Sequence, residues 1–98
     1  MKTIIIKDIV KGTSTHSEAL PFFLEMNNVV VTSNESVVLS FNNIEFVSSS
    51  FLNSSIGQFI EKYGFDRFSK NVKFADCKTD IAARIKDYVL KYKSLVNS

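Results

Sequence analysis

Residues 36–41, with the sequence Ser-Val-Val-Leu-Ser-Phe, carry the pattern that most constrains how this chain folds. Val37, Leu39 and Phe41 fall on one face of an extended segment, while Val38 falls on the other. A strand that is apolar on both faces has to be covered on both, which favours a central position in a sheet. The pattern therefore predicts a sheet with other elements packed against it.

Strand-like and helix-like segments alternate around this central strand. Residues 3–10 and 71–76 read as strands, because β-branched and other apolar side chains cluster there. Two later segments repeat apolar side chains at helical spacing. These two stripes are Leu52, Ile56, Phe59, Ile60 and Tyr63, and Ile81, Ile85, Tyr88, Val89, Tyr92 and Val96.

Capping residues set the expected ends of these helices. Ser49 or Ser50 is expected to cap the helix at 51–63, and Gly64 to end it in a left-handed conformation. Thr79 or Asp80 is expected to cap the final helix. The outer face of that helix carries Arg84, Lys86, Asp87, Lys91 and Lys93.

The region between residues 15 and 31 is less sharply defined. Thr15 and Glu18 have the spacing of a capping box, which predicts a helix from that point. Pro21 lacks the N–H that a helix interior needs, so we expect the helix to start later or to be kinked. Residues 29–31 fit either the end of that helix or a short strand.

The order of segments predicts an α/β fold for residues 1–98, read as a single domain. We expect a single-layer mixed sheet of about four strands with three helices, in which right-handed crossovers join parallel strands. The composition, 45% hydrophobic and 22% charged, is that of an ordinary folded protein.

The charge and cysteine content limit the possible partners and compartments. A net charge of +2 is mild and gives little support to a nucleic acid partner. Cys77 is the only cysteine, so the chain has no internal disulfide, which fits a reducing compartment. No apolar stretch approaches the roughly 20 residues of a membrane helix. We therefore expect a soluble, cytoplasmic protein with no membrane partner.

Catalytic chemistry finds little support in the sequence. His16 is the only histidine, and we interpret it as a surface or cap residue. Cys77 lies between a strand and a helix start, where a thiol can lose its proton more readily, yet we interpret it as inert and partly buried. The scattered carboxylates and isolated glycines match no metal or nucleotide motif. We expect no enzyme activity, no cofactor and no metal.

The segment at 46–59 stands out because a strand end runs through several serines into a helix. The serines are at 48, 49, 50, 54 and 55, more than one cap needs. A polar first turn at a helix N-terminus favours an anion, because free N–H groups and the helix dipole face it. The segment therefore predicts an exposed surface able to receive a phosphoryl group.

This segment resembles the central motif of STAS domains, the fold of anti-sigma factor antagonists. In those domains a strand of the type Val-Leu-Asp-Leu-Ser-Gly-Val-x-Phe leads to Asp-Ser-Ser-Gly-Leu at a helix start. The similarity is closer to a divergent STAS-like group, in which a Ser-Phe pair followed by Leu-Asn-x-x-Ile-Gly opens the helix. Ser50-Phe51-Leu52-Asn53 and Ile56-Gly57 match that pattern.

The resemblance implies a regulatory binding role. In the better-known STAS domains the second serine of the pair, which corresponds to Ser50, is phosphorylated by a kinase of the GHKL ATPase type, and phosphorylation toggles binding. Two positions depart from that pattern. Ser48 replaces an acidic residue, and Phe51 replaces a glycine, so that we expect a bulky ring to pack into the core.

Two functions from different classes follow from these observations. The first is a non-enzymatic module of bacterial-type signalling that binds a protein, with a GHKL-type ATPase or serine kinase as the candidate partner. Its expected contact residues are Ser48, Ser49, Ser50, Asn53, Ser54 and Gln58, with Ser50 and then Ser49 as phosphorylation candidates. The alternative is a small-molecule or nucleotide-binding domain that uses the helix N-termini near Ser50 and Thr79. Monomer and homodimer both remain open.

Overall fold

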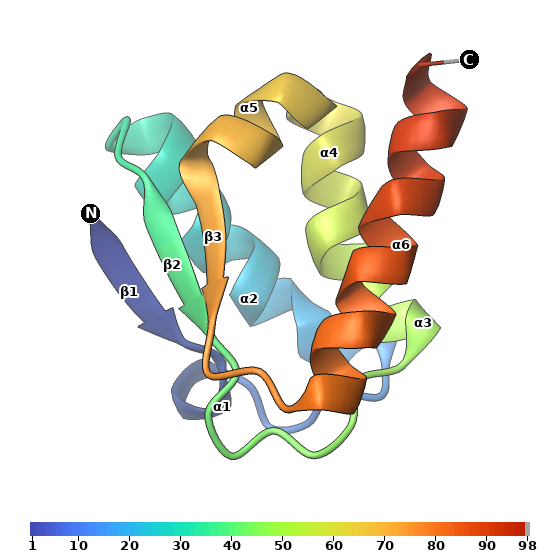
Figure 1. The fold of residues 1–98 in the computed structure, drawn as a ribbon. Helices are drawn as coiled ribbons and strands as arrows, with labels where there is room; N and C mark the ends of the chain where they lie inside the picture. Colours follow the sequence, from blue (N-terminus) through green and yellow to red (C-terminus); the bar gives the residue numbers. More distant parts are fainter. Residues whose placement is uncertain (98) are drawn as a thin grey trace.

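A three-stranded parallel sheet forms the centre of the molecule (Figure 1). The structure is a computed structural model that describes residues 1–97, including all side chains except those of 92 and 94–97. Strand β2 (Val37–Ser40) lies between β1 (Lys2–Ile5) and β3 (Val72–Ala75). The predicted central position of this strand is confirmed.

The sheet differs from the expected one in strand number and direction. We predicted about four strands in a mixed sheet, whereas the described residues form three strands that all run parallel. Residues 29–31, considered as an extra strand, lie in a π-helical turn, η1 (Asn28–Thr32), where Val29 and Val30 are buried. The β-branched valines therefore serve core packing in a helix, against their local preference for a strand.

Helices account for most of the remaining chain. In chain order they are α1 (Ile6–Ile9), α2 (His16–Asn27), η1, α3 (Ser49–Leu52), the π-helical η2 (Asn53–Gly57), α4 (Gln58–Tyr63), α5 (Phe65–Asn71) and α6 (Thr79–Asn97). Elements α3, η2 and α4 follow one another without a break, so residues 49–63 form one continuous helical segment. The predicted alternation of strand and helix is therefore confirmed, although helices outnumber the expected three.

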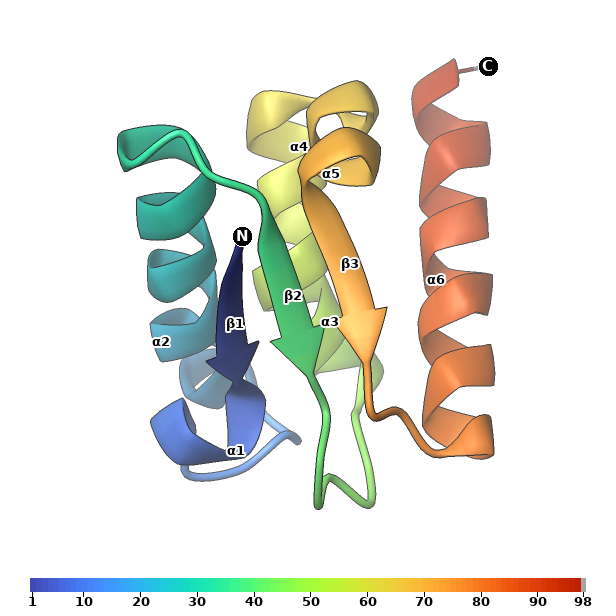
Figure 2. The same ribbon diagram turned by 60° about the vertical axis from the view of Figure 1, so that its left-hand side comes forward.

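The helices lie mainly on one face of the sheet (Figure 2). Helix α2 and the segment 49–63 cover that face, while α6 stands beside the edge strand β3. The largest fully buried side chains in this layer include Phe22, Phe41, Phe51 and Phe59. Phe22 contacts both Phe41, edge to face, and Phe51, ring stacked on ring.

Strand β1 is shorter than the predicted strand at 3–10. It ends at Ile5, and the chain turns into α1, with the Val10 N–H donating to the Ile6 carbonyl at 3.2 Å. Ile6 is fully buried, whereas Lys7 and Asp8 are exposed. Burying Ile6 while leaving two consecutive charges in water suits a helical turn better than a continued strand, where successive side chains alternate faces.

The prediction of a delayed start for the first helix is wrong. Thr15 caps α2, and its side chain accepts a hydrogen bond from the Glu18 N–H, while Glu18 accepts from the Thr15 N–H. The expected capping box is therefore present. The helix continues through Pro21, which is exposed on its outer side. The capping box and the buried face of α2 outweigh the missing backbone hydrogen bond at Pro21.

The remaining helix and strand ends lie close to the predicted positions, and one helix was not predicted. Gly64 ends α4 with a φ of +94°, as its position predicts. Helix α5 was not predicted. The sequence predicts Thr79 or Asp80 as the cap of α6, but both lie in its first turn, and the Lys78 carbonyl accepts the first helical bond from Ala82. Lys78 therefore takes the cap position. The expected strand at 71–76 is β3, one residue shorter at each end.

Most of the apolar stripe predicted for the last helix is confirmed. Ile81 and Ile85 are buried, and Tyr88 and Val89 are half-buried. The side chains of Tyr92 and Val96, the other two members, lie outside the described part of the chain. The charged residues assigned to the outer face of this helix are all exposed.

Candidate functional site

The serine corner, residues 48–50, lies where the loop after β2 turns into helix α3. The loop leaves the sheet at Phe41 and turns at Asn43, whose φ is +63°. It then buries Ile44 and Val47 against the core. The corner is thus held close to the carboxyl ends of the strands, the edge of a parallel sheet where ligands usually bind.

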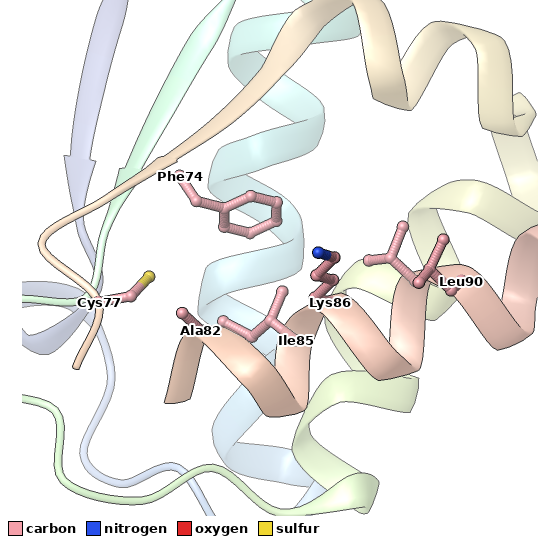
Figure 3. A pocket seen from close by; sticks show the side chains of 7 residues that line it. Phe74, Cys77, Ala82, Ile85, Lys86 and Leu90 are labelled. Carbon is pink, nitrogen blue, oxygen red and sulfur yellow. The ribbon is translucent and has the colours of Figure 1, made fainter. Parts of the chain in front are cut away.

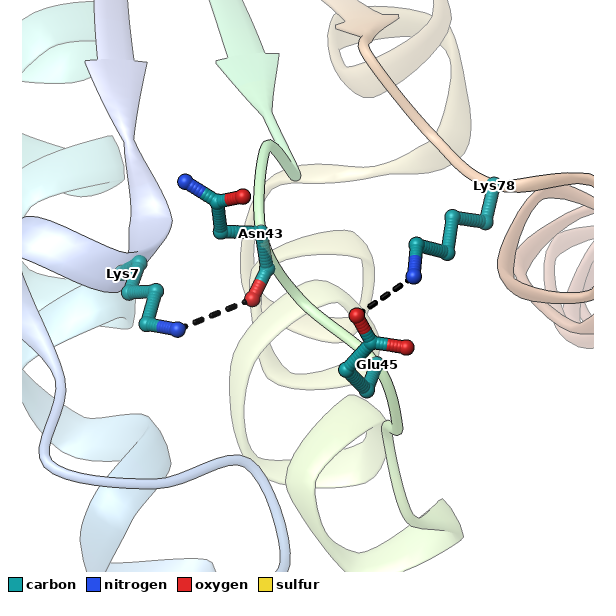
Figure 4. A network of polar contacts seen from close by, with 4 residues as sticks. All are labelled: Lys7, Asn43, Glu45 and Lys78. Carbon is teal, nitrogen blue, oxygen red and sulfur yellow. Dashed lines mark hydrogen bonds and ion pairs between the residues drawn. The ribbon is translucent and has the colours of Figure 1, made fainter.

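Two contacts hold this loop from opposite sides (Figure 4). The Lys7 ammonium, from α1, donates to the Asn43 carbonyl at 3.1 Å. Glu45 pairs with Lys78, the residue directly before α6. Both contacts are exposed, so each contributes little to stability. They nevertheless link the loop to the first and last helices of the chain.

Ser48 caps helix α3, which corrects the prediction that Ser49 or Ser50 does so. Its hydroxyl accepts a hydrogen bond from the Phe51 N–H at 3.0 Å and donates to the Ser14 carbonyl at 2.6 Å. Its N–H donates to the Thr13 carbonyl at 3.0 Å. The loop at 13–14 therefore selects Ser48 over its two neighbours. Ser48 is half-buried and its hydroxyl is already engaged.

Ser49 and Ser50 occupy the first turn of α3, and both are exposed. The next residue, Phe51, is fully buried, and its ring stacks on that of Phe22, with centroids 5.8 Å apart. The expectation that the Phe51 ring packs into the core is confirmed. A buried aromatic side chain and a capped first turn together hold the two serines at the surface.

The remaining residues of the expected contact set extend along the same helical segment. Asn53 and Gln58 are exposed, whereas Ser54 is half-buried. The Asn53 side-chain oxygen accepts from the Tyr88 hydroxyl of α6 at 2.5 Å. Ser54 hydrogen-bonds the ring of His16 at the start of α2. We call the expected contact set, Ser48, Ser49, Ser50, Asn53, Ser54 and Gln58, the partner face.

A surface depression of about 360 Å³ separates the serine corner from α6. Ser49 and Leu52 line one wall, and α6 supplies the other with Asp80, Arg84, Asp87, Tyr88 and Lys91. The two cations and two acids leave its charge balanced. Arg84, Asp87 and Lys91 belong to the predicted outer face of this helix, but nothing in the sequence placed that face next to Ser49.

Gly57 lets α6 approach the helical segment closely. A Cβ atom at this position would clash with the Tyr88 hydroxyl. The neighbouring contact between Tyr88 and Asn53 lies on the same surface. Tyr88 therefore packs against Asn53 and Gly57, two residues of the motif Leu-Asn-x-x-Ile-Gly. This contact positions α6 beside Ser49.

Comparison with protein families identifies the fold directly. Residues 18–82, about two thirds of the chain, match a family model described as a STAS-like domain of unknown function. The chain belongs to this family. The resemblance seen in residues 36–57 is thereby confirmed. Comparisons with curated proteins and with solved structures gave no significant match.

The only histidine of this STAS-like domain contacts a serine of the partner face. His16 is exposed at the start of α2, and its Nδ1 lies within hydrogen-bonding distance of the Ser54 hydroxyl. The interpretation of His16 as a surface residue is confirmed. In Ser-His catalysis a carboxylate hydrogen-bonds the histidine ring and orients it as the base. Among the described residues, no carboxylate makes this contact with the His16 ring.

Cys77 is half-buried between β3 and α6. Loss of water contact raises the pKa of its thiol, and the nearby Asp76 carboxylate raises it further. A helix start can make a thiol more acidic, but at Cys77 burial and the negative charge of Asp76 act in the opposite direction. The thiol is therefore a weak nucleophile at neutral pH.

In the part of the chain that the structure describes, no group of three or more His, Cys, Asp or Glu side chains is arranged to hold a metal ion. Within residues 1–97, no helix combines the length and the apolar character needed to cross a membrane.

Proposed function

We propose that this STAS-like domain is a non-enzymatic regulatory module that binds another protein through the partner face. One observation carries the proposal: Ser49 and Ser50 are exposed on the first turn of α3, and that turn is held in place. The Phe51 side chain is buried in the core, and the Ser48 hydroxyl caps the turn. Fixed, exposed groups lose little conformational freedom on binding, which favours recognition. Asn53 and Gln58 extend this exposed surface along the segment.

Phosphorylation of Ser50 is the switch that we propose for this surface, with Ser49 as the second candidate. A phosphoserine adds roughly −1.5 to −2 charges at neutral pH. The Phe51 ring is buried beneath the turn, so it leaves the space around the Ser50 hydroxyl open despite replacing the glycine of better-known STAS domains. The resemblance to those domains supports a GHKL-type ATPase or serine kinase as the partner.

Intact-mass spectrometry tests the switch. The domain is incubated with ATP and a candidate GHKL-type ATPase, and we expect one phosphoryl group to be added. Ser50→Ala should abolish the addition, while Ser49→Ala tests the second candidate. Ser69→Ala is the matched control, because Ser69 is an exposed serine on α5, away from the partner face. A phosphoryl group that persists in the double variant Ser49→Ala, Ser50→Ala would remove the switch from this surface.

Binding of a small molecule or nucleotide is the second candidate function. The depression next to Ser49 favours it, because Arg84 and Lys91 could face an anion there. Asp80 and Asp87 line the same depression and would repel a polyphosphate, so we rank protein binding first. A thermal-shift panel of nucleotides separates the two functions, since a nucleotide site would raise the melting temperature with one of them.

A cytoplasmic location is part of the proposal. The single cysteine and a nucleotide-dependent kinase partner both fit a reducing compartment that contains ATP. Whether the module acts as a monomer or a homodimer is decided by sedimentation over a range of protein concentrations. Nucleic acid and membrane partners form no part of the proposal.

A further inference from the structure

A second surface lies on the other side of α6 from the serine corner (Figure 3). It is a groove of about 270 Å³ between the edge strand β3 and α6. Phe74 of β3 forms one wall, and Ile85, Val89 and Leu90 of α6 form the other. Leu90 is 52% exposed, although it is a large apolar residue. The groove is therefore an apolar surface that the rest of the described chain leaves accessible.

The backbone of β3 faces this groove. The Phe41 N–H of the loop after β2 donates to the Ala75 carbonyl at 3.0 Å, so Ala75 directs its main-chain groups toward β2. Because the N–H and C=O of successive strand residues point to alternate sides, those of Phe74 point outward, away from β2. Among the described residues, no backbone hydrogen bond to Phe74 is present on that outer side. The groove thus offers both main-chain hydrogen bonds and an apolar wall.

Two lysines, Lys73 and Lys86, and one acid, Asp76, which directly follows β3, lie near this edge of the sheet. Lys86 is the only charged residue among those that line the groove in the described chain. Lys73 of β3 is exposed on the sheet face opposite to Phe74, because successive strand side chains alternate. The acidic residues Asp80 and Asp87 of α6 line the depression next to Ser49 instead. Of the charged α6 residues that line these two surfaces, Asp80 and Asp87 lie with Arg84 and Lys91 in the depression, and Lys86 lies in the groove.

We propose that this groove binds an extended segment of a partner protein in which apolar residues alternate with acidic ones. The segment adds to the sheet as a strand beside β3, using the outward main-chain groups of Phe74. Its apolar side chains face Phe74, Ile85 and Val89, and its acidic side chains, on the opposite face, meet Lys73. This surface is separate from the partner face and does not depend on the switch at Ser50.

An extended peptide suits the groove better than a small molecule does. Pockets for small molecules typically measure about 300–1,000 Å³ and enclose most of the ligand. The groove, about 270 Å³, is at the lower limit of that range, and it is bounded by a strand edge where the outward main-chain groups of Phe74 match an extended backbone. Lys73, on the opposite face of the strand, selects for acidic side chains in the added strand.

Fluorescence anisotropy with a defined probe tests the proposal. The probe is a fluorescein-labelled peptide of sequence Glu-Val-Glu-Val-Glu-Val-Glu, and we expect saturable binding. Lys73→Glu should weaken it by about tenfold or more, because like charges would then meet. Lys91→Glu is the matched control, since it makes the same charge change on the Ser49 side of α6 and should leave binding unaltered within about twofold. In an antiparallel addition the central valine lies opposite Phe74 and donates to its carbonyl, so the same peptide with that valine N-methylated should not bind.

Amide hydrogen exchange supplies the second readout. The peptide should slow exchange of the Phe74 amide, whereas the amides of the serine corner should be unaffected. Absence of binding, or binding that survives both Lys73→Glu and N-methylation, would overturn the proposal. Protection of Phe74 that grows with protein concentration without any peptide would also overturn it, because a second copy of the chain would then be the occupant.

Discussion

Helices α2 and α6 flank the same helical segment, residues 49–63, but they hold it in different ways. Helix α2 completely buries Ala19, Phe22 and Met26, and Phe22 stacks directly on Phe51. In the described part of α6, Ile81 and Ile85 are buried, while Tyr88 is half-buried and donates to Asn53. Surface depressions lie on both sides of α6, one next to Ser49 and one next to β3.

The difference between the two helices suggests that the α2 side stabilises the fold and that the α6 side is available for binding. On the α2 side, close aromatic packing fixes the backbone beneath the serines. On the α6 side, exposed polar groups and open depressions leave room for contacts with other molecules. Substitutions on the α2 side should therefore affect folding, and those on the exposed serines should affect binding alone.

The largest effect is expected from Phe51→Ala. Removing a fully buried ring that stacks on Phe22 leaves a cavity, and we expect a loss of about 3–5 kcal/mol in the free energy of unfolding. Ser50→Ala, one residue away and exposed, should change it by less than about 0.5 kcal/mol. Urea denaturation measures both variants. A similar loss in the two would contradict the division between a packed and an exposed side.

Gly57→Ala tests the contact between the helical segment and α6. The added Cβ would clash with the Tyr88 hydroxyl, and overpacking of this kind costs about 1–3 kcal/mol. The higher helix propensity of alanine offsets about 1 kcal/mol of that cost. Thermal unfolding of a double-mutant cycle should show that Gly57→Ala is less harmful in a Tyr88→Phe background. An equal effect in both backgrounds would mean that Tyr88 does not restrict this position.

Ser48→Ala should have a smaller effect on folding. It removes the cap of α3 and the hydrogen bond to the Ser14 carbonyl, and the loss of a helix cap typically costs about 1 kcal/mol. Ser49→Ala is the control, because Ser49 is exposed and does not cap the helix. Chemical denaturation should distinguish the two variants. If Ser49→Ala were the more damaging substitution, the assignment of the cap to Ser48 would be wrong.

The smallest effect concerns Glu18 and pH. Hydrogen bonds from the Ser14 N–H and then from Thr15 hold the pKa of Glu18 below its ordinary value. A carboxylate with a lowered folded-state pKa stabilises the fold above its unfolded pKa, and this contribution is lost as pH falls through the folded pKa. Glu18→Gln keeps a capping side chain but cannot titrate. Denaturation between neutral and acidic pH should therefore show a shallower loss of stability on acidification in Glu18→Gln than in the parent.

The sequence predicted an element correctly where the local residue pattern agrees with the way that element packs in the fold. The central strand followed from apolar side chains on both faces of residues 36–41, and the capping box of α2 followed from Thr15 and Glu18. Neighbouring serines at 48–50 are chemically equivalent as caps, and contacts from Thr13 and Ser14, distant in sequence, select Ser48. Local pattern alone could not make that choice.

Sequence patterns could not predict where α6 packs. Its apolar stripe predicted a helix, but the seat for Tyr88 depends on the absence of a Cβ at Gly57 and on the Asn53 side chain. Helix α5 was missed because its short turn buries Phe68 alone and carries charges around it. Long-range contacts, more than local preference, therefore determine the surroundings of Ser49.

Backbone amide chemical-shift mapping during titration with a candidate GHKL-type ATPase tests the assignment of the partner face most directly. We expect the perturbed amides to cluster at Ser49, Ser50, Asn53 and Gln58, with little change on the far side of α6. Perturbations confined to β3, α5 or the groove beside them, with the serine corner unchanged, would contradict the assignment.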